Sequence, residues 1–449
     1  MSAVEEAFVC SGAAPGRVVF PGDLDELQAL VREAAQERHA LVPAGNGTHL
    51  GIGNPPRRYD VAVSVRRLDR LVAHAAGDMT VTVEAGMNLD ALDRTLAAAG
   101  QWLPIDPPAP ASTTVGGMLA ADRSGPLRYA HGKARDFLIG CAVVSASGEL
   151  VRGGGRVVKN VAGYDLPKLM IGSYGTLGVI VEATFKVRPR PAGTRLFAWR
   201  RSSLAAALTG ALVLRDAPLA ASCLEVVDAA SAAAIGLERH PAIVVGFAGG
   251  GSELDAQATA LERVVRSRDA RAADVAGGEL QVFDGDPSLA LWRALRDAAL
   301  AAPNELLLRV SAPPTKLNEI VPRLVEETTR AGFATRACAH AGSGVARLKI
   351  DPDAATHAVH QASDLSGEGN VAAASLEGVA ELVHRLAAMA AQLGAAIVCE
   401  ALPRDLYGTV DVWDGSHACD PRALALMQAV KLKLDPSGVF SPGRFVAGI

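Results

Sequence analysis

Three glycine-rich segments stand out in the first half of the chain, and the first of them is PAGNGTHLGIGNP at positions 43–55. Glycines allow consecutive backbone N–H groups to face one concavity, which suits a phosphate group. Asn46 and Thr48 lie between the glycines and can add side-chain hydrogen bonds. The spacing matches neither G-x-G-x-x-G nor G-x-x-x-x-G-K-[ST], so it supports neither a Rossmann fold nor a P-loop. An ordinary surface loop explains this segment equally well when it is taken alone.

The other two segments repeat the same combination of residue types. STTVGGMLA at positions 112–120 places hydroxyl groups before a glycine pair and an apolar helix start. VVKNVAGYDLPKLMIGSYGTLGVI at positions 157–180 carries four glycines and few charges. One phosphate would not need three such loops. Together they favour a long, jointed ligand that contains a diphosphate.

The elements that must position these loops are predicted from hydrophobic periodicity. Helical spacing covers residues 24–38 and 89–99, and alternating or buried strand patterns cover 61–65, 80–84 and 179–187. These patterns predict an α+β unit. The segment VRPRPAG at positions 187–193 has the prolines and glycine of a domain boundary.

After residue 193, strand-like runs alternate with alanine-rich helices, which predicts a second α+β domain around an antiparallel or mixed sheet. A helix is expected over residues 421–432, followed by the tail DPSGVFSPGRF. We therefore expect three parts: residues 1–190, residues 191–405, and a C-terminal helix and tail over residues 406–449 that return to the first domain.

Composition excludes several classes of protein. Lys and Arg total 44 against 48 Asp and Glu, the pI is about 6.2, and aromatic residues make up 4%, so nothing favours a nucleic-acid partner. No apolar run reaches the about 20 residues of a membrane span. The start MSAVEEAFVC has acids where a signal peptide needs basic residues. We expect a cytoplasmic protein without a membrane span.

The cysteines and histidines do not form a recognisable metal site. The six cysteines are scattered without a C-x-x-C pair, which argues against an iron–sulfur or zinc site in this chain and favours reduced thiols. His357 and His360 are three positions apart, but no carboxylate completes a metal triad. No metal is therefore expected.

In this combination the three loops resemble the FAD-binding domain of the vanillyl-alcohol-oxidase superfamily, which is also called the PCMH-type fold. The resemblance runs in order from about Val18 to Pro191. The segments KNVAGYDL and GSYGTLGVI are most similar to the glycolate oxidase branch. VDVWDG (410–415) and LKLDPSGVFSPGRF (432–445) are similar to the GlcE family, the smaller FAD-binding subunits of bacterial glycolate oxidases. The resemblance implies a two-subdomain FAD-binding domain followed by an α+β, ferredoxin-like cap domain.

The resemblance also implies roles for individual positions. The first loop would hold the pyrophosphate, the second loop would lie along the ribityl–diphosphate chain and flavin edge, and the end of the third would contact the adenosine part. The implied FAD-binding residues are Ala44, Gly45, Asn46, Gly47, Thr48, His49, Ser112, Thr113, Thr114, Gly116, Gly117, Ser124, Gly125, Gly178, Val179 and Ile180.

Some members of the superfamily attach flavin covalently through a histidine in the first loop. In this chain Thr48 occupies that position and His49 follows it. The resemblance therefore implies non-covalent FAD, and an alignment shifted by one residue would reverse this prediction.

Catalytic relatives carry a segment similar to HAGDGNLH, whose histidines and polar residues bind a metal or a 2-hydroxy acid. The matching segment here is HAGSGVAR, from His340 to Arg347. It retains the first histidine, but Ser343, Val345 and Arg347 replace polar positions and the last histidine. His340 and Arg347 are thus weak catalytic candidates, and a hairpin turn beside a structural histidine is the favoured interpretation.

Three functional hypotheses follow. The first is an FAD-binding oxidoreductase subunit of a glycolate oxidase-type complex, which converts a 2-hydroxy acid to a 2-oxo acid with a larger FAD subunit and an iron–sulfur subunit. The second is a self-sufficient FAD-dependent 2-hydroxy acid dehydrogenase that uses His340 and Arg347. The third, from another class, is a flavin-free scaffold subunit.

Overall fold

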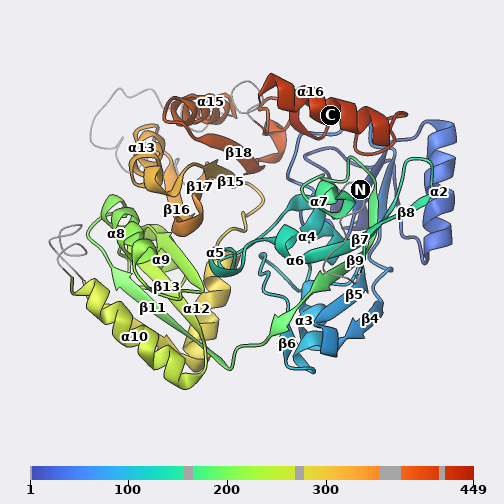
Figure 1. Ribbon diagram of the computed structural model, residues 1–449. Helices are drawn as coiled ribbons and strands as arrows, with labels where there is room; N and C mark the ends of the chain where they lie inside the picture. The colour runs from blue at the N-terminus through green and yellow to red at the C-terminus, as the bar shows by residue number, and fades with distance from the viewer. Residues whose placement is uncertain (1–2, 156–164, 268–277, 353–375, 414–419) are drawn as a thin grey trace. The chain divides into compact units, whose positions relative to one another are not determined.

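The computed structural model describes residues 3–155, 165–267, 278–352, 376–413 and 420–449 (Figure 1). The chain divides into two compact units. The first comprises Met1–Gly125, Gly132–Arg190 and Asp411–Ile449, and the second comprises Pro126–His131 and Pro191–Val410. The C-terminal segment therefore belongs to the same unit as the glycine-rich loops.

The first unit contains a three-stranded parallel sheet of order β1-β3-β2, a five-stranded antiparallel sheet of order β4-β5-β9-β7-β8, and a strand pair β10-β6. Its helices and strands are α1 (Ala3–Glu6), β1 (Arg17–Val19), α2 (Leu24–Glu37), β2 (Leu41–Ala44), β3 (Val61–Ser64), β4 (Leu71–Ala75), β5 (Thr80–Glu84), α3 (Leu89–Ala97), β6 (Gln101–Trp102), α4 (Val115–Ala121), α6 (Ala134–Phe137), β7 (Leu138–Val144), β8 (Leu150–Gly154), α7 (Leu166–Met170), β9 (Val179–Lys186), β10 (Arg188–Pro189) and α16 (Pro421–Leu434). The prediction of an α+β unit is confirmed.

Helix α2 shows how the local sequence produces these elements. The Asp23 side chain accepts a hydrogen bond from the Glu26 backbone N–H and caps the first turn. Leu27, Val31 and Ala34 recur at helical spacing and are buried in the core of the unit. This core continues through both sheets, so the loops at the strand ends start from a rigid support.

The C-terminal tail extends the parallel sheet. The backbone N–H of Leu41 donates to Val439 O at 2.7 Å, and that of Ser441 donates to Leu41 O at 2.8 Å. Between them Phe440 is fully buried, and the Asp435 carboxylate accepts hydrogen bonds from the backbone N–H groups of Val439 and Phe440. The residues after Ser441 are thereby directed toward the loop that follows β2.

The second unit is built on one eight-stranded sheet of order β14-β11-β13-β12-β16-β17-β15-β18, in which all neighbouring strands are antiparallel. Its helices and strands are α5 (Arg128–His131), β11 (Gly193–Arg200), α8 (Leu204–Asp216), β12 (Cys223–Val227), α9 (Ala229–Ala234), β13 (Ala242–Gly249), α10 (Gly251–Val265), β14 (Leu280–Asp284), α12 (Gly285–Asp297), β15 (Leu306–Ser311), α13 (Leu317–Arg330), β16 (Ala334–His340), β17 (Val345–Asp351), α15 (Leu376–Gln392) and β18 (Ala396–Ala401). The prediction of a second α+β domain is confirmed.

Helices pack on both faces of this sheet. Val244 and Val227 face α9 and α12, where they join Leu291 and Leu295 in one apolar cluster. Ile243 points to the opposite face, where it approaches Gly210 of α8. Because side chains alternate along a strand, this arrangement also places Cys338 and His340 of β16 on the face that carries α9.

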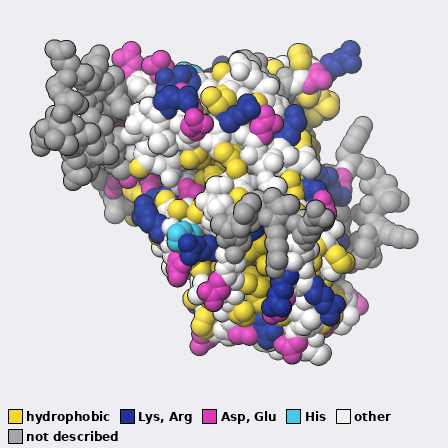
Figure 2. All heavy atoms as spheres, turned by 90° about the vertical axis from the view of Figure 1, so that its left-hand side faces the viewer, with side chains coloured by type: hydrophobic (Ala, Val, Ile, Leu, Met, Phe, Trp, Pro, Cys, Tyr) yellow, Lys and Arg dark blue, Asp and Glu magenta, His cyan; other side chains and the backbone are white. Residues whose placement is uncertain are grey.

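The surface of the described residues has mixed charge on the side shown in Figure 2. Lys and Arg side chains alternate with Asp and Glu side chains there, and no continuous region of one sign covers the described atoms in this view. Among the described helices, none is both long enough and apolar enough to cross a membrane.

Candidate functional site

The first glycine-rich loop begins directly at the end of β2. A Cβ atom on Gly45 would lie 2.0 Å from Thr114 Oγ1, so only glycine allows the first and second loops to approach this closely. Gly47 has φ +84° and its Cβ would lie 2.1 Å from Ala7 O. In the described structure, the backbone N–H groups of Asn46, Gly47 and Thr48 have no acceptor. Three consecutive free N–H groups form a suitable site for an anion.

One side-chain hydrogen bond joins the second loop to the first, and another caps the helix that follows the second loop. Asn46 Nδ2 donates to Ser112 O at 2.9 Å. Thr114 is the N-cap of α4, and its Oγ1 accepts from the backbone N–H of Gly117 at 3.1 Å. The hydroxyl-then-glycine pattern therefore encodes a capped helix whose start faces the first loop.

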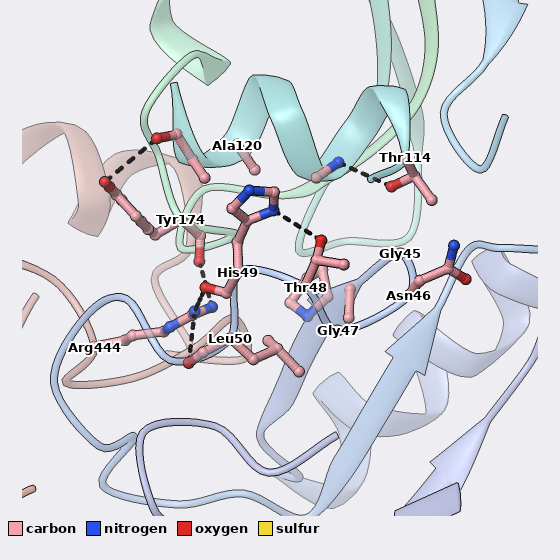
Figure 3. Close-up of a pocket in the computed structure, with 14 residues that line it drawn as sticks. Gly45, Asn46, Gly47, Thr48, His49, Leu50, Thr114, Ala120, Tyr174 and Arg444 are labelled. Carbon is pink, nitrogen blue, oxygen red and sulfur yellow. Dashed lines mark hydrogen bonds between the residues drawn. The ribbon is translucent and has the colours of Figure 1, made fainter. Parts of the chain in front are cut away.

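These segments line two adjacent pockets, the first of which is shown in Figure 3. The predicted residues in the lining of the first pocket are Ala44, Gly45, Asn46, Gly47, Thr48, His49, Thr114 and Gly117. The second pocket shares Ala44, Gly45 and Gly117 with the first and adds Gly116, Gly178, Val179 and Ile180. The structure thus brings together residues from the first and second loops and the start of β9.

Four predicted residues line neither pocket. Ser112 is exposed, and its carbonyl rather than its hydroxyl receives the contact from Asn46. Thr113 is buried and donates its hydroxyl to Pro108 O at 3.1 Å. Ser124 is buried, and Gly125 packs directly against Asp106. A role of these four residues in FAD binding stays a prediction. Residues 156–164 of the third segment lie outside the described structure.

Six residues that line the first pocket were not predicted: Pro43, Leu50, Ala120, Ala121, Tyr174 and Arg444. Only Tyr174 and Arg444 of these have polar side chains. Tyr174 has φ +53° and its hydroxyl donates to Ala121 O at 3.4 Å. Arg444 comes from the C-terminal tail and is 3% exposed. The available sequence signal was weak: Arg444 is the only charged residue between Asp435 and the chain's last residue.

The HAGSGVAR segment forms a hairpin turn between β16 and β17, which was the favoured structural interpretation. His340 is buried, and its Nδ1 lies 2.8 Å from Glu225 Oε1 on the neighbouring strand β12. Arg347 Nη1 donates to His340 Nε2 at 2.8 Å, and Arg347 Nε donates to Glu400 Oε2 at 2.8 Å. Arg309 Nε lies 3.6 Å from the other oxygen of Glu400.

This charge cluster fixes the protonation state of the histidine. A guanidinium only donates, so His340 Nε2 must be the acceptor and Nδ1–H must donate to Glu225. His340 is then a neutral imidazole with both nitrogens engaged. Burial, the largest single effect, lowers the pKa of Arg347, but the Glu400 carboxylate, together with Cys338 and Glu225, raises it overall. Neither side chain has a free atom with which to act as a base.

A metal site is not formed by these groups. Among the described residues, no group of three or more His, Cys, Asp or Glu side chains is placed to hold a metal ion. In the cluster, the Arg347 guanidinium lies between His340 and Glu400 and supplies the positive charge. His357 and His360 lie outside the described structure.

A cavity of about 300 Å³ lies beside this cluster within the second unit. Three basic side chains line it, Arg336, Arg347 and Lys349, together with Cys338 and Asp297. Burial lowers the pKa of Lys349, and the nearby Glu305 only partly offsets this effect. Each of these cations also lies beside a carboxylate, Arg336 and Lys349 beside Glu305 and Arg347 beside Glu400, so the positive charge of the lining is partly neutralised.

The family comparisons cover most of the chain. Residues 15–154 match the family model described as FAD binding domain. Residues 190–396 and 416–445 match the model described as FAD linked oxidases, C-terminal domain.

Individual relatives and structures agree with these models. D-2-hydroxyglutarate dehydrogenase of Xanthomonas citri pv. viticola is 30% identical over 96% of this chain and 89% of its own length. Glycolate oxidase subunit GlcE of Escherichia coli strain K12 is 38% identical, over 38% of this chain and 49% of its own. The structure of p-cresol methylhydroxylase with substrate bound superposes with a TM-score of 0.74, covering 96% of this chain and 88% of its own, at 14% identity. That last similarity concerns the fold alone.

Proposed function

This chain belongs to the family of FAD-linked oxidases, and from that premise we propose that it is the FAD-binding subunit of a complex that oxidises a 2-hydroxy acid to a 2-oxo acid. It is an FAD-dependent oxidoreductase of the glycolate oxidase and D-lactate dehydrogenase type, and its cofactor is FAD. The predicted superfamily, fold class and cofactor are therefore confirmed. The narrower assignment to the GlcE family, whose relative matches only part of the chain, stays a prediction.

The residues of the first unit fit FAD. Three backbone N–H groups of the first loop are free to bind a diphosphate, and no carboxylate among the described residues lines either pocket. When bound, FAD accepts the electrons of the substrate oxidation. We propose that Ala44–His49 bind the diphosphate, and that Thr114, Gly116 and Gly117 lie along the rest of the cofactor.

The observation that favours a subunit role is the state of His340. Both of its nitrogens are engaged by Glu225 and Arg347, and Arg347 is in turn neutralised by Glu400. A base that accepts the substrate proton must have a free lone pair within reach of it. The first unit offers a pocket that suits FAD, whereas the segment that matches the relatives' substrate site lacks a free acid–base group. We therefore propose that a larger FAD subunit supplies the oxidation site and an iron–sulfur subunit receives the electrons.

A self-sufficient 2-hydroxy acid dehydrogenase is the second candidate. The cavity lined by Arg336, Arg347 and Lys349 favours it, because guanidinium and ammonium groups bind the carboxylate of a small acid, although Glu305 and Glu400 already neutralise part of their charge. Relatives similar over most of their length include one named D-2-hydroxyglutarate dehydrogenase and one named glycolate oxidase subunit GlcD. A flavin-free scaffold is the weaker alternative because the family binds FAD.

Turnover by the purified chain distinguishes the two candidates. With full FAD occupancy and an artificial acceptor, we expect negligible oxidation of glycolate, D-lactate or D-2-hydroxyglutarate, because positioning of the acid and its base supplies much of the rate. Gentle affinity purification from the native cell should recover a larger flavoprotein and an iron–sulfur protein. Rapid turnover that disappears in His340→Ala would instead support the self-sufficient enzyme.

FAD should be bound without a covalent link. Thr48 cannot form a histidyl bond, and His49 Nδ1 lies 2.9 Å from Thr48 Oγ1, so this nitrogen is already engaged. Acid precipitation should release all the flavin into the supernatant and leave a colourless pellet. A pellet that stays yellow in the native protein and becomes colourless in His49→Ala would contradict the prediction and identify His49 as the attachment point.

A further inference from the structure

Arg444 joins the C-terminal tail to the first glycine-rich loop. Its guanidinium donates to four backbone carbonyls: Nη2 to His49 O at 3.2 Å, Leu50 O at 3.3 Å and Ile52 O at 3.0 Å, and Nη1 to Tyr174 O at 3.2 Å (Figure 3). It also contributes to the lining of the first pocket. One side chain thus spans the loop after β2 and the segment before β9.

Among the described residues, no carboxylate forms an ion pair with Arg444. The side chain is 3% exposed, and its Nε has no hydrogen-bond partner in the described part of the chain. Cys10 and Tyr59 interact electrostatically with it, and burial raises the pKa of both, so neither supplies a negative charge. A buried cation without a counter-ion is costly. The first pocket is therefore a favourable place for an anion.

The tail holds this cation in a fixed position. The backbone carbonyl of Arg444 accepts from Trp413 Nε1 at 3.0 Å and from the Asn54 N–H at 2.9 Å. Phe445 packs against both Trp413 and Tyr174, with ring centroids 5.1 and 5.8 Å apart. These contacts restrict the conformation of Arg444 in the free protein, so little conformational entropy of this side chain is lost when a ligand binds.

We propose that Arg444 is a positioning residue for FAD. Its guanidinium donates to the backbone carbonyls of His49, Leu50 and Ile52 and so holds the loop in a conformation in which the N–H groups of residues 46–48 are free. The cofactor's diphosphate balances its positive charge. The C-terminal tail, which is far from the glycine-rich loops in sequence, is then part of the diphosphate site. A purely structural role would hold the tail in place without any preference for phosphate.

Ligands that differ only in phosphate content separate these two roles. FAD, ADP and adenosine are titrated into the full-length apoprotein, and binding is measured by calorimetry. In Arg444→Met, the affinity for FAD and ADP should fall about 10- to 100-fold, since a charge-assisted hydrogen bond to a buried partner is lost. Adenosine should bind unchanged. The matched control is Arg422→Met on exposed helix α16, which should leave all three affinities unchanged.

Salt and a conservative variant complete the test. ADP binding to the native protein should weaken more steeply with ionic strength than ADP binding to Arg444→Met. If the Met variant does not fold, Arg444→Lys provides the measurement. This variant keeps the charge but loses part of the carbonyl contacts, so it should bind ADP more weakly than the native protein does and adenosine with the native affinity. Unchanged ADP affinity in a folded Arg444 variant, or an equal loss for adenosine and ADP, would overturn the proposal.

Discussion

Replacing Arg347 with methionine is expected to lower the free energy of unfolding of the second unit by about 3–5 kcal/mol, the usual cost of removing one partner from a buried ion pair. The substitution takes the nearest cation from the buried Glu400 carboxylate, whose second basic neighbour, Arg309, is 3.6 Å away and partly exposed. It also leaves His340 Nε2 without the donor that now engages it. Thermal or denaturant unfolding of this unit, followed by near-ultraviolet circular dichroism, measures the effect.

A double substitution tests the cause of this loss. Arg347→Met combined with Glu400→Leu removes both charges and should recover most of the stability, because apolar replacement of a buried pair is often neutral. The control is Arg323→Met on α13, whose pair with Glu319 is exposed and worth about 1 kcal/mol or less. A single Arg347→Met variant as stable as the native protein, or a double variant no better than the single one, would show that the pair is not the source of stability.

The FAD-binding unit could be anticipated because its signals are local. The order of a hydroxyl, a glycine pair and an apolar run predicts the capped start of α4, and the structure has Thr114 capping Gly117 as such a pattern requires. The glycines of the first loop are likewise explained by close contacts at the end of β2. What the pattern did not distinguish was orientation: Thr113 carries the same hydroxyl as Thr114 but directs it to Pro108.

Arg444 could not be found in this way. Its partners are His49, Leu50 and Ile52, almost 400 positions earlier in the chain, and the tail reaches them only because Phe440 pairs beside Leu41. The sequence shows that Arg444 is surrounded by uncharged residues along the chain. It does not show that the side chain is buried and forms no ion pair with a carboxylate among the described residues.

The charge cluster of the second unit depends on strand order. Glu225 faces His340 because β12 pairs with β16, and Glu400 reaches Arg347 because β15 lies between β17 and β18. Neither neighbour follows from the order of strands along the chain. The sequence showed only that Arg347 stands where catalytic relatives have the last histidine of this segment. The structure adds that this arginine donates hydrogen bonds to both His340 and Glu400.

The close approach of the two glycine-rich loops gives the last prediction. Replacing Gly45 with valine should reduce FAD affinity at least about 100-fold, because its Cβ would lie 2.0 Å from Thr114 Oγ1 and the loops must separate to accept it. Gly45 lines both pockets, so the displacement affects the whole FAD cradle. Fluorescence titration of FAD into the apoprotein measures the loss.

A matched glycine separates this effect from a general loss of stability. Gly77 lies in the same unit, has no positive φ, and has no atom within 4 Å of the position that a Cβ would take, so Gly77→Val should bind FAD normally. If Gly45→Val does not fold, Gly117→Val provides the measurement, because its Cβ would lie 3.1 Å from Thr114 Oγ1 and requires only a small adjustment. Retention of native FAD affinity by a folded Gly45 or Gly117 variant would mean that the cofactor does not lie between the two loops, since a side chain there must occupy the space that we assign to it.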